Sequence, residues 1–531
     1  MSAAQELDSI DGGEIEDAEV IIQKERLIEL PTASKVIERV RKIPEIEKPD
    51  IHPHKAQTFD YNPRIEIPEF DIVPPEQLTK EENYNHLIKL GFGNYVSPLL
   101  KARFSVPGDK NKSAGLDLDH LSFARGAKDG KNSASSESAA RVYANLSGKK
   151  VLLNSSLNYG VTRDYFYGYS SEVEVDRDTI RHEYNHLRVS TRIQNASDGT
   201  ADYEFGIDFR ATSDNFNASE NLVSLTGNVD INEQLFLETV FDYANYKDDF
   251  SVNRNHFQLK GFYRFEPLNK LQLNAGLTFS TQNDQSPELS NSQIFPFLAG
   301  NYDLSENYSI NAMLSGGYQF NSYSSLVDQN RFLGANVPVA NSEHNINSLI
   351  ALKGSPSETF SFDLFYAYNA LDNFLMLNND FLTDSIRFTT VYESGRTKIT
   401  KIGGTFFYRF NTDHEFGFNG SLINYKMDSF QEVIHLPNVD ISFTGRHRLI
   451  EGMWLNWSFK SLSGIKSFNQ SSTEQISLPS INELNLGLDY QFSDKVFGWM
   501  DIHNLINQEY QRYQNYPNRG LQVKVGLIFR L

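Results

Sequence analysis

The sequence predicts an all-β fold, a transmembrane antiparallel β-barrel of about 22 strands that follows an extended, proline-rich N-terminal segment. Three observations predict this fold. Apolar and polar residues alternate over most of the chain, short and long connections alternate between these runs, and the last residues form one more run. The apolar face of this last run, suited to lipid, comprises Val523, Val525, Leu527, Phe529 and Leu531. Its other face, suited to a polar lumen, comprises Gln522, Lys524, Gly526 and Arg530.

Composition is compatible with a spanning barrel and excludes helical membrane spans. Only 39% of the 531 residues are hydrophobic, and no run of about 18 apolar residues occurs. Barrel strands need apolar residues only at alternate positions, so a mean hydropathy of -0.46 is no obstacle. The 38 Phe and 26 Tyr suit the aromatic girdles at the two lipid-water boundaries.

Cysteine content and net charge exclude several classes of protein. The chain has no Cys, which excludes disulfides, thiolate metal sites and a lipid-anchored N-terminal cysteine. The net charge of -19 argues against nucleic-acid binding, and we expect no cofactor. No signal peptide is visible, but residues 2–5 resemble the small-residue end of one, so we expect Met1 to be a truncated or replaced start of an exported precursor.

Residues 1–85 are expected to form an extended, acidic, proline-rich periplasmic segment. They hold 8 of the 18 prolines, together with short apolar runs that are able to pair with a partner. Residues 32–43 allow one short helix with Thr32 as N-cap. The second predicted domain, residues 86–531, is the barrel.

Within the barrel region the period of the pattern is two. Tyr203, Phe205, Ile207 and Phe209, for example, alternate with polar or glycine positions. The predicted strands begin near Leu87, Leu99, Gly115, Ala139, Val151, His186, Tyr203, Leu222, Leu235, His256, Leu271, Ile294, Ser309, Asn347, Phe360, Thr397, Glu415, Val439, Met453, Asn482, Val496 and Leu521.

The connections alternate in length, as in outer-membrane barrels with short periplasmic turns and longer external loops. Short ones include 231–234, 266–270, 305–307, 411–414 and 493–495; longer ones include 122–137, 162–183, 323–345, 372–396, 464–480 and 507–520. An even strand count places both chain ends on the periplasmic side. The loop residues 374–377 and 381–382 are apolar, and we expect them to pack within the loop layer rather than to cap the pore or bind a partner.

The C-terminal residues resemble the end of TonB-dependent outer-membrane receptors. The matching elements are 503–510, 516–520 and the last strand, in which Lys524, Gly526, Phe529 and Leu531 form the barrel-assembly signal; Ile506 stands where the family usually has an aromatic residue. The resemblance implies a 22-stranded barrel in the cell outer membrane, in contact with its lipid, that binds or moves a solute.

The N-terminal segment departs from that family. Its members carry a globular plug of well over a hundred residues, whereas about 85 proline-rich residues precede the barrel here, so we expect a plug-less relative. The run Glu19, Val20, Ile21 and Ile22 weakly resembles a TonB box. Its alternative role is that of a short, strand-like apolar segment that docks on a partner or in the lumen. Whether a TonB-type energiser acts on the chain stays open.

Two further patterns in the sequence bear on chemistry. His182 and His186 flank Glu183 as in a zincin motif, but on a strand they stand about 13 Å apart, too far to share a zinc. Charged residues on the expected lumen face form cross-strand ladders or steer a solute; these are Arg188, Arg192, Glu204, Asp208, Arg210, Glu238 and Asp242, with Arg446 and Arg448.

Two functions remain open, and neither is enzymatic, because no catalytic signature appears in a suitable context. The first is an outer-membrane transport barrel related to TonB-dependent receptors. The second is a barrel subunit of an envelope assembly or secretion complex, which binds periplasmic or outer-membrane proteins through its tail and loops. The missing plug favours the second function, and the receptor-like C-terminus favours the first.

Overall fold

The computed structural model describes residues 85–531, with gaps at 107–110, 127–129, 170–172, 197–198 and 469–474. The predictions for residues 1–84 lie outside the described residues. They include the short helix at 32–43, the TonB-box-like run at 19–22 and the absence of a plug. In the described part no helix is both long enough and apolar enough to cross a bilayer.

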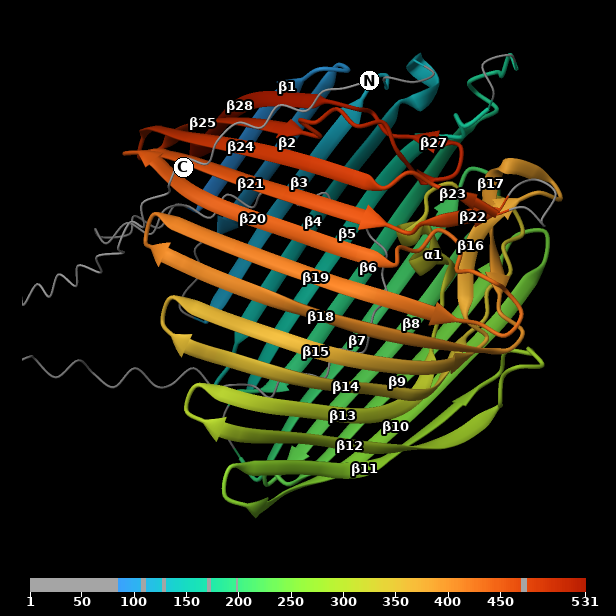
Figure 1. Cartoon of the computed structure of the whole chain (residues 1–531), viewed down its shortest axis with the longest axis vertical. Helices are drawn as coiled ribbons and strands as arrows, with labels where there is room; N and C mark the ends of the chain where they lie inside the picture. The colour runs from blue at the N-terminus through green and yellow to red at the C-terminus, as the bar shows by residue number, and fades with distance from the viewer. Residues whose placement is uncertain (1–84, 107–110, 127–129, 170–172, 197–198, 469–474) are drawn as a thin grey trace, which may run out of the picture. The chain divides into compact units, whose positions relative to one another are not determined.

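Twenty-two strands form one closed antiparallel barrel (Figure 1). Each strand pairs with its neighbours in the chain, and the ring closes where β1 (His86–Gly93) pairs with β28 (Gln522–Arg530). The other barrel strands are β2 (Ser97–Val106), β3 (Lys112–Phe123), β4 (Ser135–Ser147), β5 (Val151–Tyr165), β6 (Arg181–Asn195), β7 (Ala201–Asp214), β8 (Ser219–Ile231), β9 (Leu235–Lys247), β10 (Ser251–Leu268), β11 (Leu271–Gln282), β12 (Ser292–Ser305), β13 (Tyr308–Gln319), β14 (Ser342–Ser357), β15 (Phe360–Asp372), β18 (Arg396–Asn411), β19 (His414–Lys426), β20 (Val439–Ile450), β21 (Met453–Ser463), β24 (Ile481–Ser493) and β25 (Val496–His503).

The predicted fold class is therefore confirmed, and each of the 22 predicted strands is present. The predicted starts lie within five residues of the observed ones. The largest differences occur at β6, β10 and β14, which begin five residues earlier than expected. At these loop-side ends the inward residues contact loops instead of water, so the apolar-polar alternation is lost there.

The two faces of the wall follow the alternation. Ile207 is 55% exposed on the outer face, whereas the next residue, Asp208, points to the lumen and pairs with arginines of the same face. Apolar side chains on the outside need lipid, and charged side chains on the inside need water or partners. The pattern of side chains is that of a membrane-spanning wall.

The barrel has two unlike ends. At one, which we call the short-turn end, tight turns join the strands, as at Asn232 and Glu233, which both adopt left-handed backbone angles. The backbone N–H of Leu531 donates to His86 there, so the C-terminus lies at this end, beside the start of β1. At the other, which we call the loop end, lie the longer connections.

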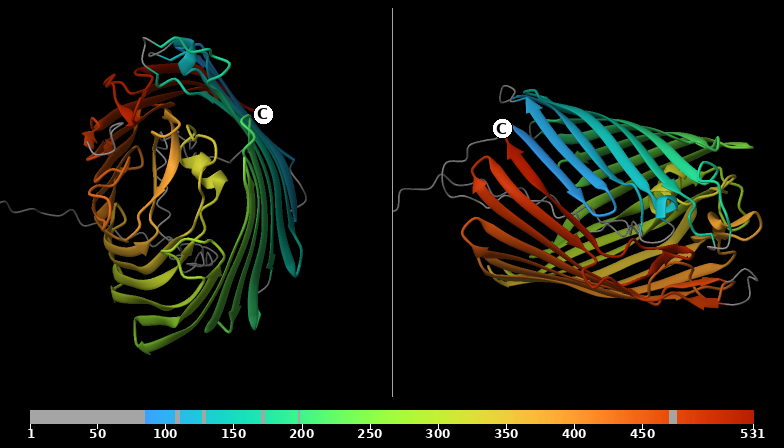
Figure 2. Two further views of the ribbon diagram at one scale, coloured as in Figure 1. Left: turned by 90° about the vertical axis from the view of Figure 1, so that its right-hand side faces the viewer. Right: turned by 90° about the horizontal axis from the view of Figure 1, so that it is seen from above.

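The loops contain structure that the sequence did not predict. The elements are η1 (Gly130–Ser133), α1 (Tyr323–Gln329), the hairpin of β16 (Leu375–Asp380) and β17 (Asp384–Tyr392), and the strand pairs β22 (Lys466–Phe468) with β23 (Gln475–Ser477) and β26 (Gln511–Tyr513) with β27 (Tyr516–Pro517). Seen from the loop end, the β16–β17 hairpin and α1 lie inside the ring of strands (Figure 2).

Candidate functional site

Loops fold inward over the loop end of the barrel and share one hydrophobic core. We call this structure the lid; it comprises 166–169, 173–180, 320–341, 373–395 and 504–521. Its core joins the lid to side chains of the wall and contains Ala134, Tyr165, Phe166, Ile180, Tyr184, Ala218, Tyr246, Tyr323, Leu326, Val327, Leu333, Val337, Leu377, Ile386, Phe388 and Tyr516. Because its loop residues follow β5, β13, β15 and β25, which are spread around the ring, burying them together requires the loops to cross the mouth.

The β16–β17 hairpin spans the mouth. At its foot, Arg396 of β18 pairs with Asp372 of β15 at 2.8 Å. Near its tip, the hydroxyl of Tyr169, which follows β5, donates to Asp384 at 2.7 Å, and that of Tyr516 donates to the carbonyl of Ile386 at 2.7 Å. β5 and β15 lie almost opposite each other in the ring. The hairpin is therefore held on both sides of the barrel.

The segment with α1 is attached to the wall at its first turn. Ser322 caps α1, and its hydroxyl accepts from the N–H of Ser325. The buried carboxylate of Glu220, on β8, accepts from the N–H groups of Tyr323 at 2.8 Å and Ser324 at 3.0 Å. These N–H groups have no partner inside a helix, so Glu220 satisfies them. One carboxylate of the wall therefore holds the start of α1.

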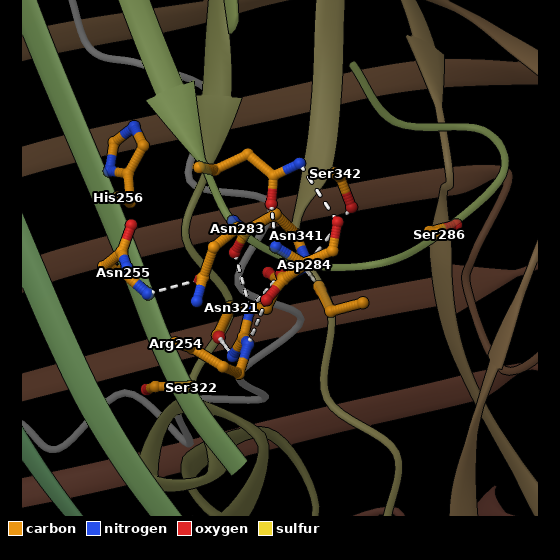
Figure 3. A network of polar contacts seen from close by, with 12 residues as sticks. Arg254, Asn255, His256, Asn283, Asp284, Ser286, Asn321, Ser322, Asn341 and Ser342 are labelled. Atoms are coloured by element: carbon orange, nitrogen blue, oxygen red, sulfur yellow. Dashed lines mark hydrogen bonds and ion pairs between the residues drawn. The ribbon is translucent and has the colours of Figure 1, made fainter. Parts of the chain in front are cut away.

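A second attachment is the network around Arg254, which is 1% exposed (Figure 3). This β10 side chain forms a two-point ion pair with Asp284 of the β11–β12 loop, at 2.7 and 2.6 Å. It also donates to the carbonyl of Asn321 and to the side chain of Asn341, the two ends of the α1 segment. The Asp284 carboxylate accepts in turn from the N–H of Asn341 at 2.7 Å. A buried charge needs such complete pairing, and here it ties wall, loop and lid together.

His435 links a third group of loops. Its Nδ1 donates to the carbonyl of Leu377 in the hairpin at 3.0 Å, and its Nε2 accepts from the N–H of Gln514 at 3.3 Å. Arg512 donates to its backbone carbonyl. Burial lowers the pKa of His435 to about 4; the Leu377 hydrogen bond opposes this shift and the nearby Arg512 adds to it. A neutral imidazole is thus required to join three loops.

Most of the predicted lumen charges pair with a side chain of a neighbouring strand, and Arg210 pairs with Asp208 of its own strand. Asp208 pairs with Arg188 at 2.6 Å and with Arg210 at 3.0 Å. The remaining pairs are Arg192 with Glu204 at 3.3 Å, Glu238 with Lys260 at 2.6 Å, Asp242 with His256 at 3.0 Å and Arg448 with Asp413 at 3.5 Å. Arg446 lies opposite Glu415 in the strand register. Their effect on a solute stays a prediction.

Three neighbouring strands bring together a serine, a histidine and an aspartate. His256 Nδ1 lies 3.0 Å from Asp242, and its Nε2 lies 3.2 Å from the hydroxyl of Ser280. Sequence reasoning missed this set, because only strand register brings the three side chains together. Ser280 is 0% exposed and the ring of Phe320, in the lid, stacks on His256. The hydroxyl of Ser280 is thus covered, and the three side chains form a buried polar network.

The zincin-like residues lie on β6, as expected. His182 is buried and bonds Asp214 at 3.1 Å, while His186 lies near Thr212. Among the described residues no group of three or more possible ligands is placed to hold a metal ion. Burial agrees with the expected packing for the loop residues Phe374, Met376 and Leu377 but not for Leu382, which is 96% exposed in the turn of the hairpin.

The residues predicted to form the barrel-assembly signal lie on β28 or directly after it, at the seam where the ring closes. Lys524 is buried in the lumen face, while Phe529 lies opposite Ile88 and Leu531 is exposed. A Cβ on Gly526 would lie 1.9 Å from the carbonyl of Leu90 and 2.7 Å from the indole nitrogen of Trp499, and one on Gly91 would lie 2.2 Å from the same ring. The two glycines therefore make room for Trp499, whose N–H donates to Leu90 at 3.2 Å.

Comparison with known proteins gives matches at the level of structure. No family model matches the chain, and no curated protein matches it in sequence. The solved structures include the siderophore receptor PirA from Acinetobacter baumannii, with a TM-score of 0.65 and 10% identity over 85% of this chain and 81% of that one. The fold is that of outer-membrane siderophore receptors.

Two more receptors of this fold match over similar lengths. The pyoverdine outer-membrane receptor FpvA from Pseudomonas aeruginosa has a TM-score of 0.64 at 12% identity and covers 85% of this chain and 79% of its own. The ferric-catecholate import receptor Fiu from Escherichia coli has a TM-score of 0.63 at 8% identity, covering 85% and 82%. The expected likeness to receptor barrels is confirmed at the level of the fold.

Proposed function

We propose that this protein is an outer-membrane barrel that binds a solute and admits it through a lumen closed by the lid. The observation that carries the proposal is the shared core of the lid, which crosses the mouth and is fixed to the wall through Arg254 and Glu220. A passive pore has no need of such a structure. The receptor fold and the lipid-suited outer face support the outer membrane as its location.

The proposal has three further parts. The short-turn end faces the periplasm, as in barrels with short periplasmic turns. The protein performs no catalysis, since the hydroxyl of Ser280 is covered. Residues 1–85 do not supply a globular plug for the lumen, which is supported by their proline-rich composition.

A cross-link that locks the lid tests the gating. The chain has no native Cys, so Tyr169→Cys with Asp384→Cys gives one defined pair between the hairpin and the β5–β6 loop. A bismaleimide with a reductant-cleavable spacer joins the two cysteines, because the spacer bridges the gap that the tyrosine ring filled. Mass spectrometry then measures the solute taken up from culture extract by sealed outer-membrane vesicles that carry the protein with its loop end outside.

We expect the locked protein to take up less solute than the two single-cysteine controls, and reductant to restore uptake. Equal uptake into the vesicles in the locked and cleaved states would contradict gating by the lid. The double-cysteine protein without the cross-link must take up solute as the single-cysteine variants do. This control separates the effect of locking the lid from any effect of the substitutions themselves.

A second candidate function is a barrel subunit of an envelope complex. Leu382 favours it, because a fully exposed leucine in the turn of a lid hairpin suits a protein contact. Purification of the tagged protein in mild detergent discriminates between the candidates. A stoichiometric protein partner that is lost on Leu382→Ser supports the complex, and a lone barrel with bound solute supports transport.

A further inference from the structure

Six residues on the lumen face form one row across six neighbouring strands, β2 to β7. The strand register places Arg103 opposite Asp117, Asp117 opposite Arg141, Arg141 opposite Asn158, Asn158 opposite Arg188, and Arg188 opposite Arg210. Four of the six positions are therefore arginines. We call these six residues the arginine row.

The carboxylates near the row are shared between arginines. Asp117 lies 3.6 Å from Arg103 and 3.9 Å from Arg141, and Asp208 lies 2.6 Å from Arg188 and 3.0 Å from Arg210. Asp119 adds a second carboxylate at Arg103, 2.9 Å away. Arg192 pairs with Glu204 beside the row. Five arginines thus face four carboxylates, which leaves one positive charge in excess on this part of the wall.

The arginines reach further into the lumen than their partners do. The side chains of Arg141 and Arg188 are 52% and 48% exposed, against 15% for Asp117 and 17% for Asp208. A solute that passes along this wall therefore meets guanidinium groups before carboxylates. Guanidinium groups bind phosphate, sulfate and carboxylate oxygens through paired N–H donors.

The spacing of the row selects elongated anions. Neighbouring strands lie about 4.8 Å apart, so Arg103, Arg141 and Arg188, on every second strand, are about 10 Å apart along the wall. A single small anion meets one or two of them. An anion with several acidic groups meets three or four.

We propose that the arginine row binds a multiply charged anion, and that the solute of the proposed transport function belongs to this class. This inference rests on the proposed function for its physiological meaning. Binding itself does not depend on movement of the lid, because in detergent the short-turn end also faces solution.

The test uses the full-length protein in detergent, with inorganic tripolyphosphate as the probe and isothermal titration as the measurement. Arg141→Gln and Arg188→Gln each remove one arginine but leave Asp117 with Arg103 and Asp208 with Arg210, so the wall keeps its ion pairs. We expect each change to weaken binding about tenfold, as loss of a charge-assisted hydrogen bond does. Citrate in the same titration distinguishes carboxylates from phosphates as the preferred groups.

Arg409→Gln is the matched control. Arg409 is 50% exposed, pairs with Glu415 at 2.8 Å and lies on β18, far from the row in the ring. This variant should bind tripolyphosphate as the wild type does. Failure of the wild type to bind either anion, or equal weakening by Arg188→Gln and Arg409→Gln, would overturn the inference. The lid-locking experiment is a separate measurement, so one proposal can fail while the other stands.

Discussion

At the residue scale, His435 shows how one neutral side chain joins loops that are distant in sequence. Both of its ring nitrogens are used, one as donor to Leu377 and one as acceptor from Gln514. A proton on Nε2 removes the acceptor and places a positive charge near Arg512. The left-handed backbone at this position, with φ 55°, is also tolerated by asparagine.

The contact between the lid and the loop that carries His435 should therefore weaken in acid. The pKa of His435 falls from 6.5 to about 4 in the folded lid, so its contribution is complete above about pH 6.5 and is lost as pH falls toward 4. The loss amounts to roughly 3 kcal/mol at most. The protection factors of residues 373–395 and 427–438, which correct hydrogen exchange for the intrinsic chemical rate at each pH, should fall between pH 7 and pH 4.5.

His435→Asn keeps the backbone conformation and removes the titration. Exchange in this variant should be nearly the same at both pH values, apart from the intrinsic chemical rates. If protection in the variant fell as steeply between the two pH values, the acid response would belong to other titrating groups.

At the element scale, the strands were predictable and the lid was not. Alternation such as that around Ile207 is local and marks each strand, since lipid and lumen demand opposite side chains at successive positions. The contacts of Arg254 are made with residues 30 to 87 positions away in sequence, which no local pattern reveals. The β16–β17 hairpin lies in a segment that the sequence predicts to be a loop. Its apolar residues face other loops, so they show no alternation that marks a strand.

Arg254 should matter to the lid and not to the barrel. Arg254→Ala leaves the buried Asp284 without its cation, which costs about 3 to 5 kcal/mol locally. We expect faster proteolysis within residues 320–341, while the folded barrel keeps its heat-modifiable mobility in electrophoresis. The control is Arg264→Ala, on the same strand near the short-turn end, where Arg264 donates to Asn274. Cleavage that is unchanged in Arg254→Ala would mean that the network does not hold the lid.

At the scale of the whole molecule, the assignment of faces decides whether the ring is a membrane wall. Strand pairing closes the ring without a free edge, and apolar residues such as Val142, Leu225 and Ile207 are exposed on its outside. In water such a surface would aggregate, whereas in lipid it is stable. The likeness to receptor structures at 8% to 12% identity shows that this pattern, and not particular residues, determines the fold.

Charge placed on the outer face should prevent insertion. Ile207 lies in the middle of β7, so Ile207→Arg should cost about 2 to 4 kcal/mol near the bilayer midplane. Ser190, opposite Asp208 in the register, is the lumen-facing control, because an arginine there points into the polar lumen and not into lipid. The folded, membrane-inserted fraction should fall for Ile207→Arg alone. If both changes lowered the inserted fraction to a similar extent, the assignment of the outer and lumen faces would be wrong.

The closing seam has a consequence for how the chain finds its final form. The ring of Trp499 fits over Gly91 and Gly526, and the ammonium of Lys89 lies 3.9 Å from it. Trp499, on β25, is paired with Gly526 of β28, so a slip of this strand pair by two residues along β1 would place Lys89 or Gly93 where Gly91 now lies beneath the indole. Of these two residues only Lys89 would put a side chain where a Cβ already collides with the ring. Trp499 and its acceptor Leu90 are 409 positions apart in the chain. The indole ring of Trp499 therefore opposes the misaligned closure of the barrel that would place Lys89 beneath it.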